Sequence, residues 1–182
     1  MRAVNIMVGG TPGQEFPTWA YPNGRHLGEF LIPSYSCVVT GSDNSGNSVS
    51  RNFVVLRFGV QCIDMKTPKI VGLTDHQTHV IKAWVGSYRV HSAASDETGA
   101  WRVYNNFLIH DGPDYVSTRP PFATIGCIEV TGPQGFDIFN DLIIELSGSK
   151  AASREEQLEE IGRAKSLRIT YERAIRPPLK RR

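Results

Sequence analysis

Short apolar runs separated by glycine and proline dominate the first 130 residues, and this pattern constrains the fold more than any other feature. Such runs, rich in β-branched and aromatic residues, favour short strands over long helices. The 17 Gly and 11 Pro of the chain supply turns between them. Residues 79–90 are expected to form one long strand or a hairpin about Gly86. The other predicted strands lie at residues 3–8, 30–40, 53–60, 69–73, 101–110 and 126–130.

Helical spacing begins only after these strands. Apolar residues recur at steps of three and four over residues 136–147, which predicts a helix that Gly148 ends. Ser153, with Glu156 three residues later, is typical of a helix N-terminus. A second apolar stripe then predicts a longer helix over about residues 152–175.

Together these patterns predict a mainly β (α+β) fold, a mixed β-sandwich across residues 1–132 with C-terminal helices. We expect one domain over residues 1–148, followed by a C-terminal helix and basic tail over residues 149–182. Residues 150–182 hold ten Lys and Arg against five Glu. This tail either touches an anionic surface or is a solvated, frayed terminus.

Composition excludes several classes of function. The formal net charge of +2 is too small to argue for a nucleic-acid partner. No stretch approaches the ~20 consecutive apolar residues of a membrane-spanning helix. Residues 1–10 lack the apolar core of a signal peptide, so export, if it occurs, is expected to follow a non-classical route.

The three cysteines do not form a disulfide scaffold or a zinc-finger pattern. Cys37 and Cys62 lie in strand-like runs and are expected either to be buried as small apolar residues or to form a disulfide in an oxidising compartment. Cys127 has a different context, because it follows Gly126 at the start of a predicted strand.

A histidine stands at the end of another predicted strand, seventeen residues before that cysteine. The chain leaves His110 through a Gly-Pro turn, passes a proline-stiffened loop and returns through Gly126 to Cys127. This path predicts that the imidazole and the thiol meet. An imidazole that takes the thiol proton converts a poor nucleophile into a thiolate. Gly126 is expected to leave room for a substrate and for backbone N–H groups that face an oxyanion.

The same residues resemble the catalytic motif of the L,D-transpeptidase (YkuD-like) family. In that motif a His is followed, after a loop, by Ser or Thr, a variable residue, Gly and Cys. Here His110 matches the His, and Thr124, Ile125, Gly126 and Cys127 match the end. The resemblance covers about twenty residues well and extends only weakly back to about residue 50.

The resemblance implies a reaction on the tetrapeptide stems of peptidoglycan. Cys127 would attack the carbonyl of meso-diaminopimelate, D-Ala would leave, and an amine or water would resolve the thioester. His110 would act as general base and then acid. Asp111, or a carbonyl near Gly112, would orient the imidazole. Neither a metal nor an organic cofactor is implied.

The departures from the family pattern concern substrate recognition. Relatives often carry Arg where Glu129 stands here, and that Arg plausibly handles a substrate carboxylate. Arg119, Arg102 or Arg57 are candidates to replace it, because a guanidinium suits a carboxylate. The resemblance thus implies substrate-binding roles for Gly112, Thr124, Arg119 and Arg102.

The missing export signal, taken with the motif, makes the chain similar to type VI secretion effectors of the L,D-transpeptidase-like kind. That similarity implies a toxin that acts in the periplasm of a rival bacterium, with a cognate immunity protein as partner.

Two other functions remain open. One is a non-catalytic peptidoglycan-binding or secretion-apparatus module of the same fold, and the other is a cysteine hydrolase of a different amide. His76 and His79 have metal-ligand spacing, but strand-end histidines without a metal are the favoured interpretation. Aromatic residues that could line a groove, but that more often pack in a core, are Trp84, Tyr88, Trp101 and Tyr104.

Overall fold

The structure is a computed structural model that describes residues 1–90, 97–116 and 125–182. It is mainly β, with 40% strand and 16% helix, and it carries a large curled mixed sheet and two C-terminal helices, so the predicted fold class is confirmed. Within the described residues, ten strands form the large sheet in the order β8-β13-β1-β4-β5-β12-β11-β10-β9, with β2 paired to β4. A small second sheet has the order β3-β6-β7.

The strands are β1 (Val4–Val8), β2 (Glu15–Trp19), β3 (Tyr21–Pro22), β4 (Glu29–Ser42), β5 (Ser48–Leu56), β6 (Gly59–Cys62), β7 (Lys69–Val71), β8 (Gln77–Val80), β9 (Ala83–Val85), β10 (Ala100–Tyr104), β11 (Phe107–Asp111), β12 (Ile128–Val130) and β13 (Leu167–Tyr171). The predicted strand at residues 53–60 is thus divided between β5 and β6, which belong to different sheets.

The segment at residues 79–90 is neither one long strand nor a hairpin about Gly86. Instead β8 pairs with β13 and β9 pairs with β10, so consecutive strands join the two edges of the sheet. Between them the N–H of Ile81 donates to Leu167 O at 2.9 Å, and the N–H of Lys82 donates to Arg102 O at 2.7 Å. The sheet therefore curls back on itself, an outcome that depends on long-range pairing and leaves no local sequence signal.

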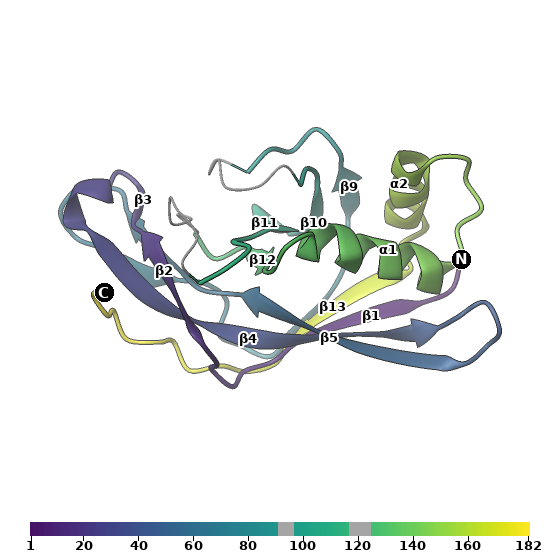
Figure 1. Ribbon diagram of the computed structural model, residues 1–182, viewed down its shortest axis with the longest axis horizontal. Helices are drawn as coiled ribbons and strands as arrows, with labels where there is room; N and C mark the ends of the chain where they lie inside the picture. Colours follow the sequence, from purple (N-terminus) through teal and green to yellow (C-terminus); the bar gives the residue numbers. More distant parts are fainter. Residues whose placement is uncertain (91–96, 117–124) are drawn as a thin grey trace.

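Helix α1 (Gly135–Ser147) lies along one face of the sheet, as Figure 1 shows. Its predicted apolar face is buried in the main core. Gly148 ends it in the left-handed conformation, with φ 74°, as expected for a glycine C-cap. The buried indole of Trp101 donates to Asn140 Oδ1 at 2.8 Å, which ties the helix to β10.

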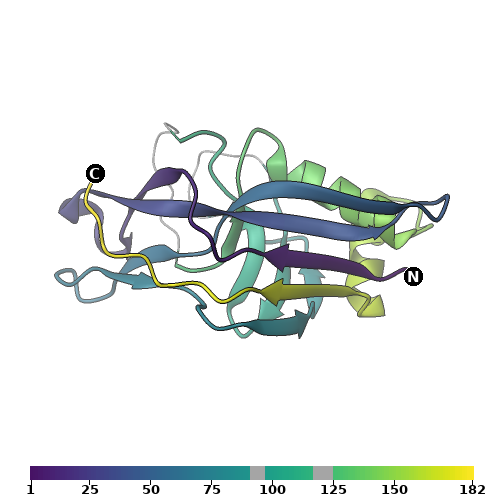
Figure 2. The ribbon, with the colours of Figure 1, turned by 90° about the horizontal axis from the view of Figure 1, so that it is seen from below.

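The long helix predicted over residues 152–175 is wrong in its second half. Helix α2 (Arg154–Ala164) begins with the predicted capping box at Ser153, but the chain then turns into β13, which pairs in parallel with β1. Leu167, Ile169 and Tyr171 are buried with a period of two. A spacing of four residues, from 167 to 171, fits a helix face and a strand face equally well. The apolar pattern alone therefore could not distinguish a helix from a strand here. Figure 2 shows β13, β1, β4 and β5 side by side.

The basic tail is docked on the protein rather than frayed. Its backbone pairs with β4, where Leu31 N–H donates to Lys180 O at 2.8 Å. Lys180 forms an ion pair with Glu15, and Arg182 forms one with Glu29. Arg176 and Arg181 donate to backbone carbonyl oxygens, so the cations of residues 176–182 already have partners. In the described part of the chain, none of the helices has the length and apolar character to cross a bilayer.

Candidate functional site

Strands β11 and β12 bring the predicted histidine and cysteine to one face of the sheet. The two strands are parallel, with His110 opposite Glu129. Side chains alternate along a strand, so Ile109 and Ile128 face the main core. His110, Cys127 and Glu129 face the other way. The sequence predicted from the loop path that the imidazole and the thiol meet, and the parallel register of β11 and β12 places both side chains on the same face.

These side chains line a cavity of about 360 Å³. It is large enough for an amino-acid-sized group and lies near the lower end of the volumes usual for ligand sites. The wall is mixed, with apolar, aromatic and charged side chains. Its lining residues are Tyr21, Tyr88, Arg89, Asn106, Leu108, His110, Ile125, Cys127 and Glu129.

A backbone carbonyl orients the imidazole. His110 Nδ1 lies 2.7 Å from the carbonyl oxygen of Asp111. A carbonyl can only accept, so Nδ1 carries the hydrogen and Nε2 of the neutral ring keeps its lone pair. The ring is buried, at 2% exposure, and packs against Tyr88 with the ring centroids 5.3 Å apart. The imidazole is therefore held in the tautomer that suits a general base at Nε2.

The thiol of Cys127 is enclosed, with 7% of the residue exposed. Its Sγ lies 3.8 Å from Asn106 O, a weak contact from the turn between β10 and β11. Burial raises the pKa of Cys127 to about 11, a hydrogen bond from the Leu108 backbone lowers it, and the Glu129 carboxylate raises it. Without a bound substrate the thiol is therefore neutral near pH 7.

Glu129 is a buried carboxylate in the wall of the same cavity. It is 1% exposed, and its Oε1 lies 4.0 Å from His110 Nε2. The site thus combines a thiol, an imidazole and a carboxylate. Sequence comparison with the family pattern marked this position only as a departure.

Asp111 contributes its carbonyl to the histidine, while its side chain lies on the opposite face of β11. There its carboxylate approaches those of Glu97 and Asp114, with ligand atoms all within 4.8 Å of one another. Burial raises the pKa of Asp114, which favours its neutral form and reduces the repulsion in this cluster. The prediction left open Asp111 or a carbonyl near Gly112, and the group that holds the imidazole is the backbone carbonyl of Asp111, next to Gly112. The N–H of Gly112, a predicted substrate-binding residue, donates to Val130 O at 2.9 Å within the sheet.

The glycine at position 126 was expected to leave room for substrate and for backbone N–H groups that face an oxyanion, and the structure gives it a packing role as well. The residue has φ 99°, and a Cβ there would lie 3.0 Å from Gly72 Cα. The backbone of Gly72 occupies the room that the missing side chain leaves. Gly126 therefore serves a left-handed turn and a close backbone approach immediately before Cys127.

Two of the predicted carboxylate-binding arginines, Arg102 and Arg57, lie outside the described cavity wall. Arg102 is exposed on β10 and lies outside that wall. Arg57 is buried, and its guanidinium donates to the carbonyl oxygens of Gly9, Glu172 and Leu73. Two other predicted substrate-binding residues, Arg119 and Thr124, lie outside the described residues.

Arg89 is the arginine that lines the cavity, and the sequence analysis did not single it out. Tyr21 was also missed, and Tyr88 was named only as one of several aromatic residues. Burial raises the pKa of Tyr88 to about 12, and the negative charges of Cys127 and Glu129 contribute. None of these three lies near the motif in sequence, so only contacts between distant parts of the chain bring them to it.

The other predicted features are structural. The three cysteines are free and buried, so no disulfide joins Cys37 to Cys62. His79 stacks on Tyr104, and neither it nor His76 belongs to a metal-binding group among the described residues. Trp101 lies in the core, where Trp84 packs against it.

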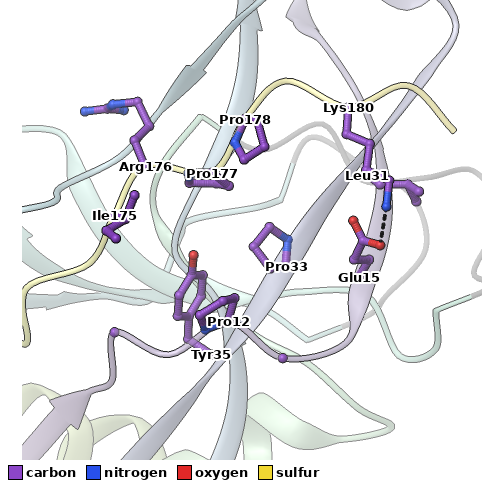
Figure 3. A pocket seen from close by; sticks show the side chains of 12 residues that line it. Pro12, Glu15, Leu31, Pro33, Tyr35, Ile175, Arg176, Pro177, Pro178 and Lys180 are labelled. Carbon is purple, nitrogen blue, oxygen red and sulfur yellow. Dashed lines mark hydrogen bonds and ion pairs between the residues drawn. The ribbon is translucent and has the colours of Figure 1, made fainter.

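A larger cavity, of about 520 Å³, lies between β4 and the C-terminal tail (Figure 3). Its wall is mostly apolar and includes Pro12, Pro33, Pro177 and Pro178. The ion pair of Lys180 with Glu15 closes one side. Because its lining has no thiol or imidazole, the smaller cavity is the better candidate for chemistry.

Comparisons of this chain with protein-family models, curated proteins and solved structures give no match in any of the three.

Proposed function

We propose that this protein is a cysteine-dependent acyltransferase of the L,D-transpeptidase kind, acting on tetrapeptide stems of peptidoglycan. The observation that carries the proposal is the shared cavity of His110 and Cys127, with Nδ1 of the imidazole bound to the Asp111 carbonyl. The substrate class rests on the short sequence motif that contains these two residues.

In the proposed reaction, Sγ of Cys127 attacks the amide carbonyl and a C–S bond forms. The thiol proton passes to Nε2 of His110. Collapse of the tetrahedral intermediate breaks the C–N bond, and His110 returns the proton to the leaving amine. The product is a thioester on Cys127, which an amine or water then resolves. This cycle uses only side chains of the cavity.

Because burial raises the pKa of Cys127, the proposed scheme places the proton transfer at the step in which substrate binds. The free thiol is neutral, so no standing thiolate–imidazolium pair is needed in this scheme. A substrate that excludes water and offsets the Glu129 charge would bring the proton affinities of sulfur and imidazole closer.

The same raised pKa favours a second candidate, a non-catalytic peptidoglycan-binding or secretion-apparatus module. In that case Cys127 is an inert buried thiol, and the cavity binds a stem peptide without cleaving it. The two candidates differ in whether a covalent intermediate forms.

Purified peptidoglycan rich in tetrapeptide stems tests the proposal. Incubation with the protein should release D-Ala and yield cross-linked, exchanged or trimmed stems, detected by mass spectrometry. Cys127→Ala and His110→Ala should each abolish these products, while Cys37→Ala should retain them. Unchanged stems with the folded wild-type protein, or equal turnover by Cys127→Ala, would contradict the proposal.

The biological setting that we propose is toxicity in the periplasm after non-classical export, with neutralisation by an immunity protein. Periplasmic expression in a bacterium should then stop growth, and Cys127→Ala should restore it. Equal toxicity of the two proteins would separate toxicity from the proposed chemistry.

A further inference from the structure

The turn between β6 and β7, residues 63–68, carries two large apolar side chains at the surface. Ile63 is 64% exposed and Met65 is 57% exposed. Neither belongs to an apolar core cluster of the described residues. Apolar side chains scattered singly over a surface need no explanation, but here two of them share one short turn. We call these two side chains the apolar tip.

The backbone of this turn already has hydrogen-bond partners. The carboxylate of Asp64 accepts from two N–H groups within the turn, at 2.9 and 2.8 Å. Asn23 Nδ2 donates to Ile63 O at 3.4 Å. His26 Nε2 donates to Met65 O at 2.7 Å, since a carbonyl can only accept. Moving the apolar tip out of water would therefore leave few backbone groups to desolvate, and a turn held in this way loses little conformational entropy on binding.

Three cations lie around the apolar tip. Lys66 belongs to the turn itself, and Arg25 belongs to the short 3-10 helix η1 (Arg25–Leu27), which supplies one of the donors to the turn. Arg181 of the C-terminal tail donates to Leu27 O at 2.6 Å, which places it against the same helix. Figure 1 shows β3 of the small sheet and the C-terminus at the same end of the molecule. Segments far apart in the sequence therefore supply the cations of this surface.

The charge around the apolar tip is positive. In the part of the chain that the structure describes, neither Lys66 nor Arg25 forms an ion pair. Arg181 donates to a neutral carbonyl, so its charge is not compensated. The turn contains one carboxylate, Asp64, and its Oδ1 accepts from the backbone N–H groups of the turn. This surface therefore combines exposed apolar side chains with an excess of cations.

We propose that the apolar tip inserts into the headgroup region of an anionic lipid membrane, while the three cations around it bind headgroup phosphates. Apolar side chains flanked by Lys and Arg are the combination that binds an anionic bilayer surface. A protein partner would need a complementary surface of about 800 Å² on each side, whereas a bilayer accommodates a small tip. The inference goes beyond the proposed reaction and does not depend on it.

Co-sedimentation of the full chain with vesicles tests the apolar part of this surface. The protein should bind vesicles of phosphatidylglycerol and phosphatidylcholine at low salt. Ile63→Ser combined with Met65→Asn should weaken this binding at least tenfold, because it removes exposed apolar surface. Asn tolerates the left-handed φ of 66° at position 65, so the turn is retained. Ile175→Ser, at a side chain that is 90% exposed on the tail, is the matched control and should bind as the wild type does.

A second set of variants tests the charged part. Arg25→Gln combined with Lys66→Gln should weaken binding to the same vesicles about twentyfold. Arg51→Gln combined with Lys150→Gln removes two other exposed cations and should weaken it less than threefold. Vesicles of pure phosphatidylcholine should bind the wild type at least tenfold more weakly. Ile63→Trp should strengthen binding to the anionic vesicles, a gain that loss of the turn would not produce.

Several results would overturn the inference. One is a wild-type protein that stays in the supernatant with anionic vesicles at low salt, as expected if the apolar tip contacts a protein instead. Another is wild-type binding by the variant of Ile63 and Met65. Equal weakening by the two charge variants would also overturn it, because general attraction between charges would then explain the association. None of these variants changes His110 or Cys127, so a failure of the proposed reaction is detected separately.

Discussion

At the scale of single residues, the candidate site combines a thiol, an imidazole and a carboxylate in one cavity. In the proposed reaction His110 is the base that takes the proton of the Cys127 thiol. Burial and the Glu129 carboxylate oppose this transfer and hold the pKa of the thiol at about 11. The balance between these groups decides when the sulfur reacts.

The first prediction concerns Glu129→Gln and the reactivity of Cys127. Removing the carboxylate charge should lower the pKa of the thiol, so alkylation by iodoacetamide should reach half its maximal rate at a lower pH than in the wild type. Peptide mass spectrometry identifies the alkylated cysteine among the three. Glu145→Gln is the matched control. An unchanged pH profile would mean that Glu129 does not act on the sulfur.

At the scale of secondary-structure elements, the parallel pair β11 and β12 positions the site, and β13 completes the sheet that supports it. Residues 149–182 were expected to add a helix and a tail. Besides α2 and the tail, they supply a strand that lies between β8 and β1. Its inward side chains belong to the main core.

The second prediction concerns the contribution of β13 to the free energy of unfolding. Ile169 is fully buried, so Ile169→Ala should lower the free energy of unfolding by about 2–5 kcal/mol. Ile175, which is 90% exposed, is a matched control, and Ile175→Ala should change it by less than about 0.5 kcal/mol. Urea unfolding followed by circular dichroism measures both. A small effect at Ile169 would show that β13 is not integral to the fold.

Elements that depend on neighbouring residues were predicted correctly from the sequence. Elements that depend on pairing between distant residues were not. The faces of α1, the Gly148 cap and the Ser153 capping box depend on neighbouring residues and are confirmed. The pairing of β8 with β13 depends on residues about ninety positions apart, which periodicity does not reveal. His110 and Cys127 are joined by one short loop, so the sequence could predict that they line the same cavity. Tyr21 and Arg89 reach that cavity through long-range contacts, so the sequence could not predict their place in it.

At the scale of the whole molecule, several ionisable groups are buried in their neutral forms. Burial raises the pKa of Cys37 from 9.0 to about 12, and that of Cys127 from 9.0 to about 11. Both thiols stay protonated in the native state at pH values where they ionise in the unfolded chain. Their contribution to stability is therefore complete below about pH 9 and is lost as pH rises toward 11–12.

The third prediction follows from the loss of stability that these raised pKa values cause at high pH. The urea midpoint should be nearly constant from pH 7 to 8.5 and should fall from pH 9 to 11. Each ionising thiol contributes at most about 1.4 kcal/mol per pH unit. Cys37→Ala should make the decline shallower, because it removes one of the two thiols. A midpoint that stays flat up to pH 11 would contradict the buried, neutral state of these residues.

The most direct test of the account is the mass of the intact protein after brief exposure to a tetrapeptide stem and rapid acid quench. The account predicts a covalent adduct, the acyl group without D-Ala, attached to Cys127 and absent from Cys127→Ala. It also predicts slower adduct formation in His110→Ala. A wild-type protein that binds the stem but gains no mass, or an adduct on another residue, would contradict the claim that Cys127 and His110 act together as nucleophile and base.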